Sequence, residues 1–111
     1  MKKFGVQLPR TLAEGLAGKT SVEKPMLFVF PVNKVHSMWM KGMLIPIDIV
    51  FADSDGKIVR VYENIQPVMG PSYSSIVPSK YALECAAGDA ARLGLVEGAY
   101  IRIFGHHPNL N

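Results

Sequence analysis

Residues 47–65 read IDIVFADSDGKIVRVYENI and carry the clearest local signal in the chain. Apolar side chains alternate before and after the segment DSDG at 53–56, and this period of two is typical of β-strands. The DSDG segment has turn chemistry, in which Gly56 supplies a positive φ without steric cost. The pattern therefore predicts a β-hairpin with strands at 47–52 and 57–65.

Shorter apolar runs surround this hairpin on both sides. Further strands are predicted at 26–30, 36–41, 81–85 and 100–104. Capping and stop signals predict two short helices at about 11–18 and 89–94, while 66–79 has no periodic pattern and is expected to be a long loop. The predicted fold class is mainly β, with α+β character at the margins: a small antiparallel β sandwich or barrel.

Composition limits the classes to which the protein can belong. The 111 residues predict one domain, 1–111, and 49% apolar residues are enough for a packed core. Twelve Lys and Arg against nine Asp and Glu give a net charge of +3, and the basic residues are scattered, so we expect no nucleic-acid partner.

Cys85 is the single cysteine, which excludes an internal disulfide. No apolar run is long enough to predict a membrane span, and no signal peptide is recognised, so a cytoplasmic location is expected.

Five blocks of sequence resemble a known family. They are MLFVFP at 26–31, WMK at 39–41, IPIDIVF at 45–51, YSS at 73–75, and YALE at 81–84 followed by Ala87 and Gly88. In this order they resemble the DUF192 (UPF0127) family over about residues 9–103. The resemblance implies a compact, mostly antiparallel β fold with short helices and no assigned biochemical role. Many members of the family carry an export signal, which is not recognised in this chain.

A ligand pocket is predicted around three positions within these blocks. Trp39, Lys41 and Asp48 match the most characteristic positions of the family that the chain resembles. Asp48 lies between two isoleucines in a predicted strand, and a buried carboxylate must be paired or hydrogen-bonded. Lys41 is the nearest cationic candidate, so a structural ion pair or a solvated sheet face is the alternative interpretation. The candidate ligand-binding residues are Trp39, Lys41, Asp48, Tyr73 and Glu84, with the 66–79 loop as a cover.

The favoured function is a non-enzymatic module that binds a small ligand or a partner. No cofactor is expected, because no nucleophile with a base, no phosphate loop and no set of metal-ligand spacing is found in the sequence. One alternative is a Cu(I) carrier that uses His36, Met38 and Met40, which alternate along one strand face. Another is a small hydrolase or lyase with Asp48 and Glu84 as acid and base.

Overall fold

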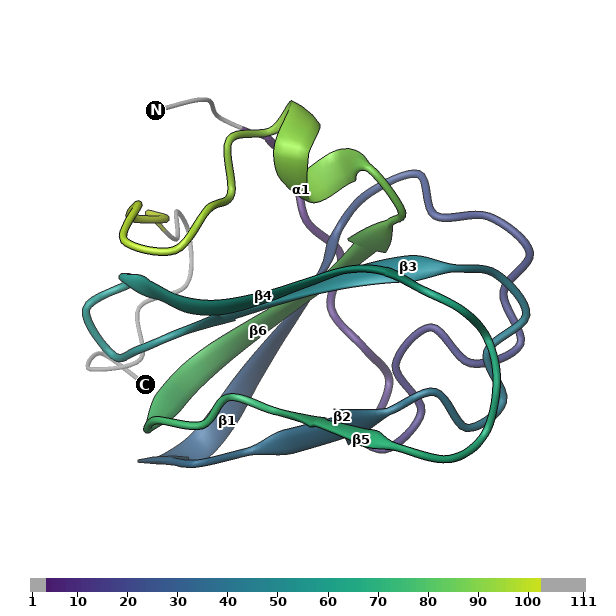
Figure 1. The fold of residues 1–111 in the computed structure, drawn as a ribbon, viewed down its shortest axis with the longest axis horizontal. Helices are drawn as coiled ribbons and strands as arrows, with labels where there is room; N and C mark the ends of the chain where they lie inside the picture. The colour runs from purple at the N-terminus through teal and green to yellow at the C-terminus, as the bar shows by residue number, and fades with distance from the viewer. Residues whose placement is uncertain (1–3, 103–111) are drawn as a thin grey trace.

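A computed structural model describes residues 4–102 as two antiparallel sheets and one short helix (Figure 1). The elements are β1 (Met26–Lys34), β2 (Ser37–Trp39), β3 (Ile47–Ala52), β4 (Ile58–Ile65), β5 (Ser72–Ser74), β6 (Ser79–Ala86) and α1 (Asp89–Arg92). The larger sheet has the order β1-β6-β3-β4, and the smaller one pairs β2 with β5. The predicted mainly β class is confirmed, and within 4–102 the sheets do not close into a barrel.

The two central strands, β3 and β6, are buried on both faces of the larger sheet. In their register Ile49 lies opposite Glu84, and Asp48 lies opposite Cys85. Since successive side chains of a strand point to opposite faces, Glu84 shares a face with Ile49, while Asp48 points to the other face. The alternation predicted for 47–52 is therefore confirmed.

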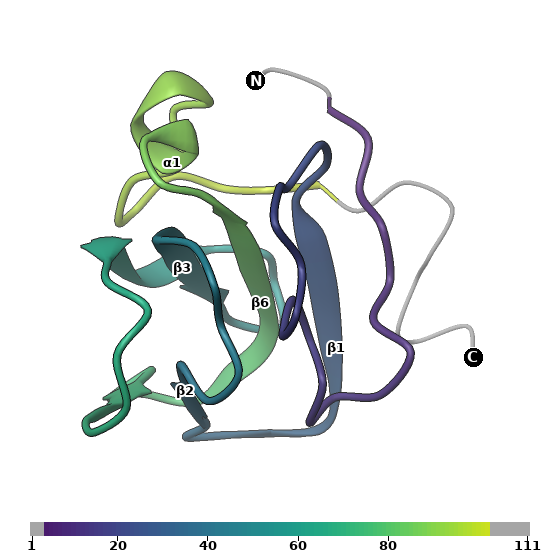
Figure 2. The ribbon, with the colours of Figure 1, turned by 90° about the vertical axis from the view of Figure 1, so that its right-hand side faces the viewer.

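Each face of the larger sheet carries its own apolar cluster. The first face holds Phe28, Ile49 and Phe51, with Met38 of β2 and Tyr73 of β5 packed against them. On the second face, apolar side chains of the sheet pack beneath Ala90 of α1. Figures 1 and 2 accordingly show the β2–β5 ribbon on one side of the sheet and α1 on the other. Among residues 4–102, no helix has the length and apolar character required to cross a membrane.

The predicted β3–β4 hairpin is confirmed, and its turn shows why a glycine is needed. The Asp53 carboxylate accepts hydrogen bonds from the backbone N–H groups of Asp55 and Lys57, both at 3.0 Å. Gly56 has φ +85°, and a Cβ at this position would lie 2.3 Å from the carbonyl oxygen of Ile101. The turn is therefore fixed by its own residues and by a close backbone contact.

The helix predicted at 11–18 is wrong, because this segment forms a succession of turns. The Thr11 hydroxyl does accept the N–H of Glu14 at 3.1 Å, as the capping signal predicts. However, Gly15 has φ +49° and Gly18 has φ +78°, and these left-handed conformations prevent a continuous right-handed helix. The second predicted helix is confirmed in shorter form as α1, and it ends before Gly94 at φ +73°.

Two further predictions need correction. The segment 66–79 is not structureless, because it contains β5, which pairs with β2 from Ser37–Ser74 to Trp39–Ser72. The strand predicted at 36–41 is reduced to β2 itself. Of the final strand predicted at 100–104, Tyr100 forms an isolated bridge with Lys57, and residues from 103 lie outside the described part of the chain.

Candidate functional site

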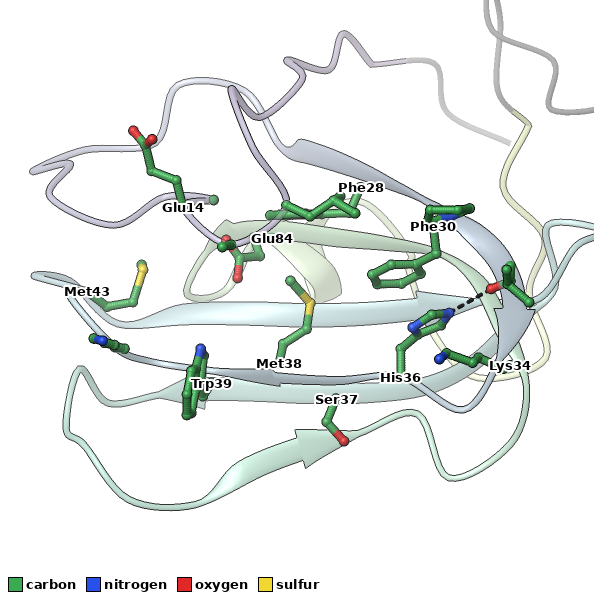
Figure 3. A pocket seen from close by; sticks show the side chains of 16 residues that line it. Glu14, Phe28, Phe30, Lys34, His36, Ser37, Met38, Trp39, Met43 and Glu84 are labelled. Carbon is green, nitrogen blue, oxygen red and sulfur yellow. Dashed lines mark hydrogen bonds between the residues drawn. The ribbon is translucent and has the colours of Figure 1, made fainter. Parts of the chain in front are cut away.

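A cavity of about 410 Å³ lies on the first face of the larger sheet, beside β2 (Figure 3). Its lining residues come from the turns after Thr11, from β1 and β2, from the segment after β2 and from β6. They are Leu12, Ala13, Glu14, Gly15, Phe28, Phe30, Pro31, Val32, Lys34, His36, Ser37, Met38, Trp39, Lys41, Met43 and Glu84.

Part of the cavity wall is apolar, because strand periodicity aims several large side chains at it. Phe28 and Phe30 are two residues apart on β1 and point to the same face. Met38 extends from β2 toward the sheet, and Met43 closes the end nearest to the turns. The cavity thus offers an aromatic and thioether surface to a guest.

Glu84 is the buried acid of the cavity, and its position defines the deep end of the cavity. It lies in the centre of β6 and is only 3% exposed. Its Oε1 accepts a long hydrogen bond from the Leu16 N–H at 3.3 Å, whereas Oε2 has no hydrogen-bond partner within residues 4–102. Burial raises the pKa of Glu84 to about 7, and the Leu16 N–H opposes this shift. The acid therefore changes charge near neutral pH.

The turns between Leu12 and Gly18 hold the chain close against this acid. A Cβ on Gly15 would lie 2.9 Å from Phe28 Cζ and 3.0 Å from Glu84 Oε1. Only glycine fits here without displacing one of these groups, and only glycine tolerates the positive φ at low cost. Gly15 thus allows Leu16 to reach Glu84.

Exposed side chains form the cavity rim, which we define as Glu14, Lys34, Trp39 and Lys41. Trp39 is 60% exposed, so its indole offers surface to a guest as well as to water. Behind the rim, the His36 ring stacks on Phe30 with centroids 3.8 Å apart. His36 Nε2 lies 2.7 Å from the Val32 carbonyl oxygen, and because a carbonyl only accepts, Nε2 carries the proton.

Comparison with known proteins assigns the chain to a family. The model of the family DUF192, described as Uncharacterized ACR, matches residues 6–103. The chain belongs to the DUF192 family. None of the curated proteins matches it.

Two solved structures share the fold of this DUF192 domain. One is a protein of unknown function from Novosphingobium aromaticivorans DSM 12444, with TM-score 0.82 and 30% identity over 90% of this chain and 75% of that chain. The other, from Sinorhizobium meliloti 1021, is named "putative transcription regulator". It has TM-score 0.76 and 32% identity over 86% of this chain and 76% of that chain.

The structure of the DUF192 domain brings together three of the five residues selected from the sequence. Trp39, Lys41 and Glu84 line the cavity. Asp48 and Tyr73 do not, and no residue of the 66–79 segment lies in the lining. The segment 66–79 was predicted to cover the pocket, whereas the turns after Thr11 flank this cavity.

Asp48 has a different environment from the one predicted, since Lys41 is not its partner. Its Oδ1 accepts the Asn64 N–H at 2.8 Å, and its Oδ2 accepts the N–H groups of Gly88 and Ala90 at 3.0 and 2.9 Å. Asp48 is fully buried and joins the end of β4 to the start of α1. The expectation that a buried Asp48 is hydrogen-bonded holds, with backbone donors in place of a lysine.

The two alternatives to a binding module receive no support from this arrangement. Asp48 and Glu84 point to opposite faces of the sheet, so they cannot act on one substrate as acid and base. His36 and Met38 line the cavity, but Met40 is buried in the core outside the lining. Within the described chain, no group of three His, Cys, Asp or Glu side chains is placed to hold a metal ion.

Sequence reasoning did not identify Phe28, Met43 and Gly15 as parts of the site. Phe28 and Met43 have the pattern of ordinary core residues, and no local signal separates a cavity wall from a filled core. The two glycines within 15–18 were the available signal, since they argue against the helix that was predicted there. A loop at this place would have been a reason to look for a cavity beside it.

Proposed function

We propose that this DUF192 domain is a non-enzymatic module that binds a small ligand in the cavity between Glu84 and the rim. One observation carries the proposal: the buried side chain of Glu84, whose carboxyl accepts one hydrogen bond at Oε1, lies in the lining of a cavity of about 410 Å³. Small-molecule sites are commonly clefts of roughly 300–1,000 Å³ with apolar walls and few polar groups. The cavity has this size, and phenylalanine and methionine side chains form the apolar part of its lining.

The lining indicates how a guest would be held. Phe28, Phe30 and Met38 would bury an apolar body, and Glu84 would bind one polar group at depth. Trp39 and Lys41 stand at the rim, where the indole can cover a guest and the ammonium can contact a polar end. This retains Trp39, Lys41 and Glu84 as the proposed ligand-binding residues.

The same geometry favours binding over a chemical step. Glu84 is the one buried acidic or basic side chain in the described lining, and no second acid or base lies beside it. His36 and Ser37 are neighbours in the lining, but His36 directs Nε2 to a backbone carbonyl. A general acid–base pair or an activated nucleophile needs two such groups in contact.

Ligand-observed NMR with a panel of metabolites and sugars tests the proposal on the wild type and on Trp39→Ala. At least one compound should show binding that Trp39→Ala weakens by about tenfold, because the indole contributes a large apolar contact. Met69→Ala is the matched control, since Met69 is 69% exposed and lies outside the cavity lining. Identical spectra for wild type and Trp39→Ala across the panel would count against the site.

A further inference from the structure

We infer that the cavity selects an organic cation: an amine whose ammonium group binds Glu84 and whose apolar body lies against the phenylalanine and methionine walls. This inference rests on the proposed function and specifies its ligand class. It follows from three features of the site, which are the free oxygen of Glu84, the rings beside it and the distribution of charge with depth.

The first feature is the incomplete hydrogen bonding of Glu84. An ionised carboxylate has about four acceptor positions, and this one uses a single long contact to Leu16 N–H. Among the described residues Oε2 is not one of the buried polar atoms that lack a partner, so it is open to the cavity and a donor can reach it there. An ammonium group supplies both N–H donors and the opposite charge, and charge-assisted bonds are the stronger kind. A neutral hydroxyl supplies only the donor.

The second feature is the aromatic wall beside the acid. A Cβ built on Gly15 would lie 2.9 Å from Phe28 Cζ and 3.0 Å from Glu84 Oε1, so the Phe28 ring lies close to the acid. Phe30 continues this wall along β1 toward the rim. Aromatic faces attract cations, and more strongly where water is excluded. Phe28 and Phe30 are therefore the rings whose faces an ammonium group bound at Glu84 would have to reach to gain this attraction.

The third feature is how charge varies with depth. The other charged or titratable groups of the described lining are Glu14, Lys34, His36 and Lys41. Glu14, Lys34 and Lys41 are exposed at the rim, and His36 is half-buried against Phe30. The lysines stay in water, so the deep end of the cavity, at Glu84, is acidic. Within residues 4–102 it contains no cation. A ligand anion is favoured at the rim and disfavoured at the deep end, whereas an ammonium group is favoured at the deep end, beside Glu84.

Titration of three probes with one skeleton tests the inference: 2-phenylethylamine, 2-phenylethanol and 3-phenylpropionate. The wild type should bind the amine at least about tenfold more tightly than the alcohol at pH 8. Because burial raises the pKa of Glu84 to about 7, ionisation should strengthen amine binding by about tenfold between pH 6 and pH 8. The propionate should show no such gain.

Two variants test whether Glu84 is responsible for the preference for the amine. Glu84→Gln should remove the preference for the amine and its pH dependence while keeping the alcohol affinity within about threefold. Glu63→Gln is the matched control, since Glu63 is an exposed acid of β4 outside the lining, and it should bind all three probes as the wild type does. Thermal melts of both variants establish that they are folded at the titration temperature.

The outcomes separate this inference from the proposed function. Equal or tighter binding of the alcohol or the propionate, still weakened by Trp39→Ala, would overturn the cation assignment and leave the binding module standing. Failure of the amine to bind at about 10 mM would also overturn it, since even a millimolar Kd is detected at that concentration. If no compound of the metabolite panel binds either, the proposed function fails with it.

Discussion

Glu84 and Asp48 lie on neighbouring central strands, and they differ in what surrounds their oxygen atoms. Asp48 accepts three backbone N–H groups, so its negative charge is matched by fixed dipoles. Glu84 accepts one long bond and faces a cavity. Both residues are acids inside strands, and the number of donors around each decides its role. Asp48 ties elements together, and Glu84 is the acid to which we assign the proposed ligand.

The stability of the folded protein should decrease as pH rises, because Glu84 ionises. Its pKa is near 4.5 when unfolded and about 7 when folded. Between these values the folded state binds more protons, so the stabilisation is complete below about pH 4.5 and lost as pH rises through 7. The loss is on the order of 3 kcal/mol of unfolding free energy. Glu84→Gln cannot ionise, so urea titrations at pH 5 to 8 should show a flatter profile. Equal slopes in both proteins would contradict the burial effect.

Asp48→Asn should destabilise the fold by about 2–4 kcal/mol, because an amide NH2 group would face backbone N–H donors that need an acceptor. Denaturant unfolding measures this cost, with Asp55→Asn in the exposed hairpin turn as control. The folded variant should keep the ligand affinity of the wild type, since Asp48 does not line the cavity. A loss of affinity without a loss of stability would return Asp48 to the binding site.

At the scale of elements, the turns at 12–18 and β2 contribute to the site beside β1 and β6. These turns and the β2–β5 ribbon are the elements that the sequence pattern described least well. The β3–β4 hairpin was predictable because its signals are local: alternation, turn chemistry and a glycine. β5 was not, because three residues are too few to show a period and their pairing with β2 is tertiary. The Thr11 hydroxyl accepts the Glu14 N–H as the capping signal predicts, but the positive φ of Gly15 prevents a helix from following.

Gly15→Ala should be more damaging than Gly18→Ala, although both glycines have positive φ. Both variants incur backbone strain of about 1 kcal/mol. At Gly18 nothing lies within 4 Å of the added methyl group, whereas at Gly15 it meets Phe28 and Glu84. Since Phe28 is fully buried, the clash should add about 1–3 kcal/mol. Thermal or urea unfolding of the two variants compares the costs. Equal destabilisation would show that the Phe28 side chain can move aside.

At the scale of the whole molecule, the site arises where two sheets and a turn segment meet. The fold class and the alternation of β3 could be predicted, because alternation is a property of neighbouring residues. The burial of β3 on both faces is seen only in the structure. The placement of Glu84 and Trp39 in one cavity could not be predicted in this way, because it depends on the ribbon folding back over the first face of the sheet. Trp39, Lys41 and Glu84 were selected for residue type and motif position, and the same reasoning also selected Asp48, which serves the opposite face. Sequence patterns give the face of a side chain within its strand, but not which loop covers that face.

Hydrogen exchange should divide the molecule into a stable sheet and a less stable ribbon. β3 and β6 are central and buried on both faces, whereas β2 and β5 have three residues each and only one another as strand partners. Two-stranded ribbons are marginal alone, so β2–β5 amides should exchange through local opening, at least about 30-fold faster than those of β3 and β6. Such opening would admit a ligand past Trp39 while Glu84 stays fixed on the sheet. NMR-detected exchange measures both sets of amides, and equal protection would mean that ribbon and sheet open as one unit.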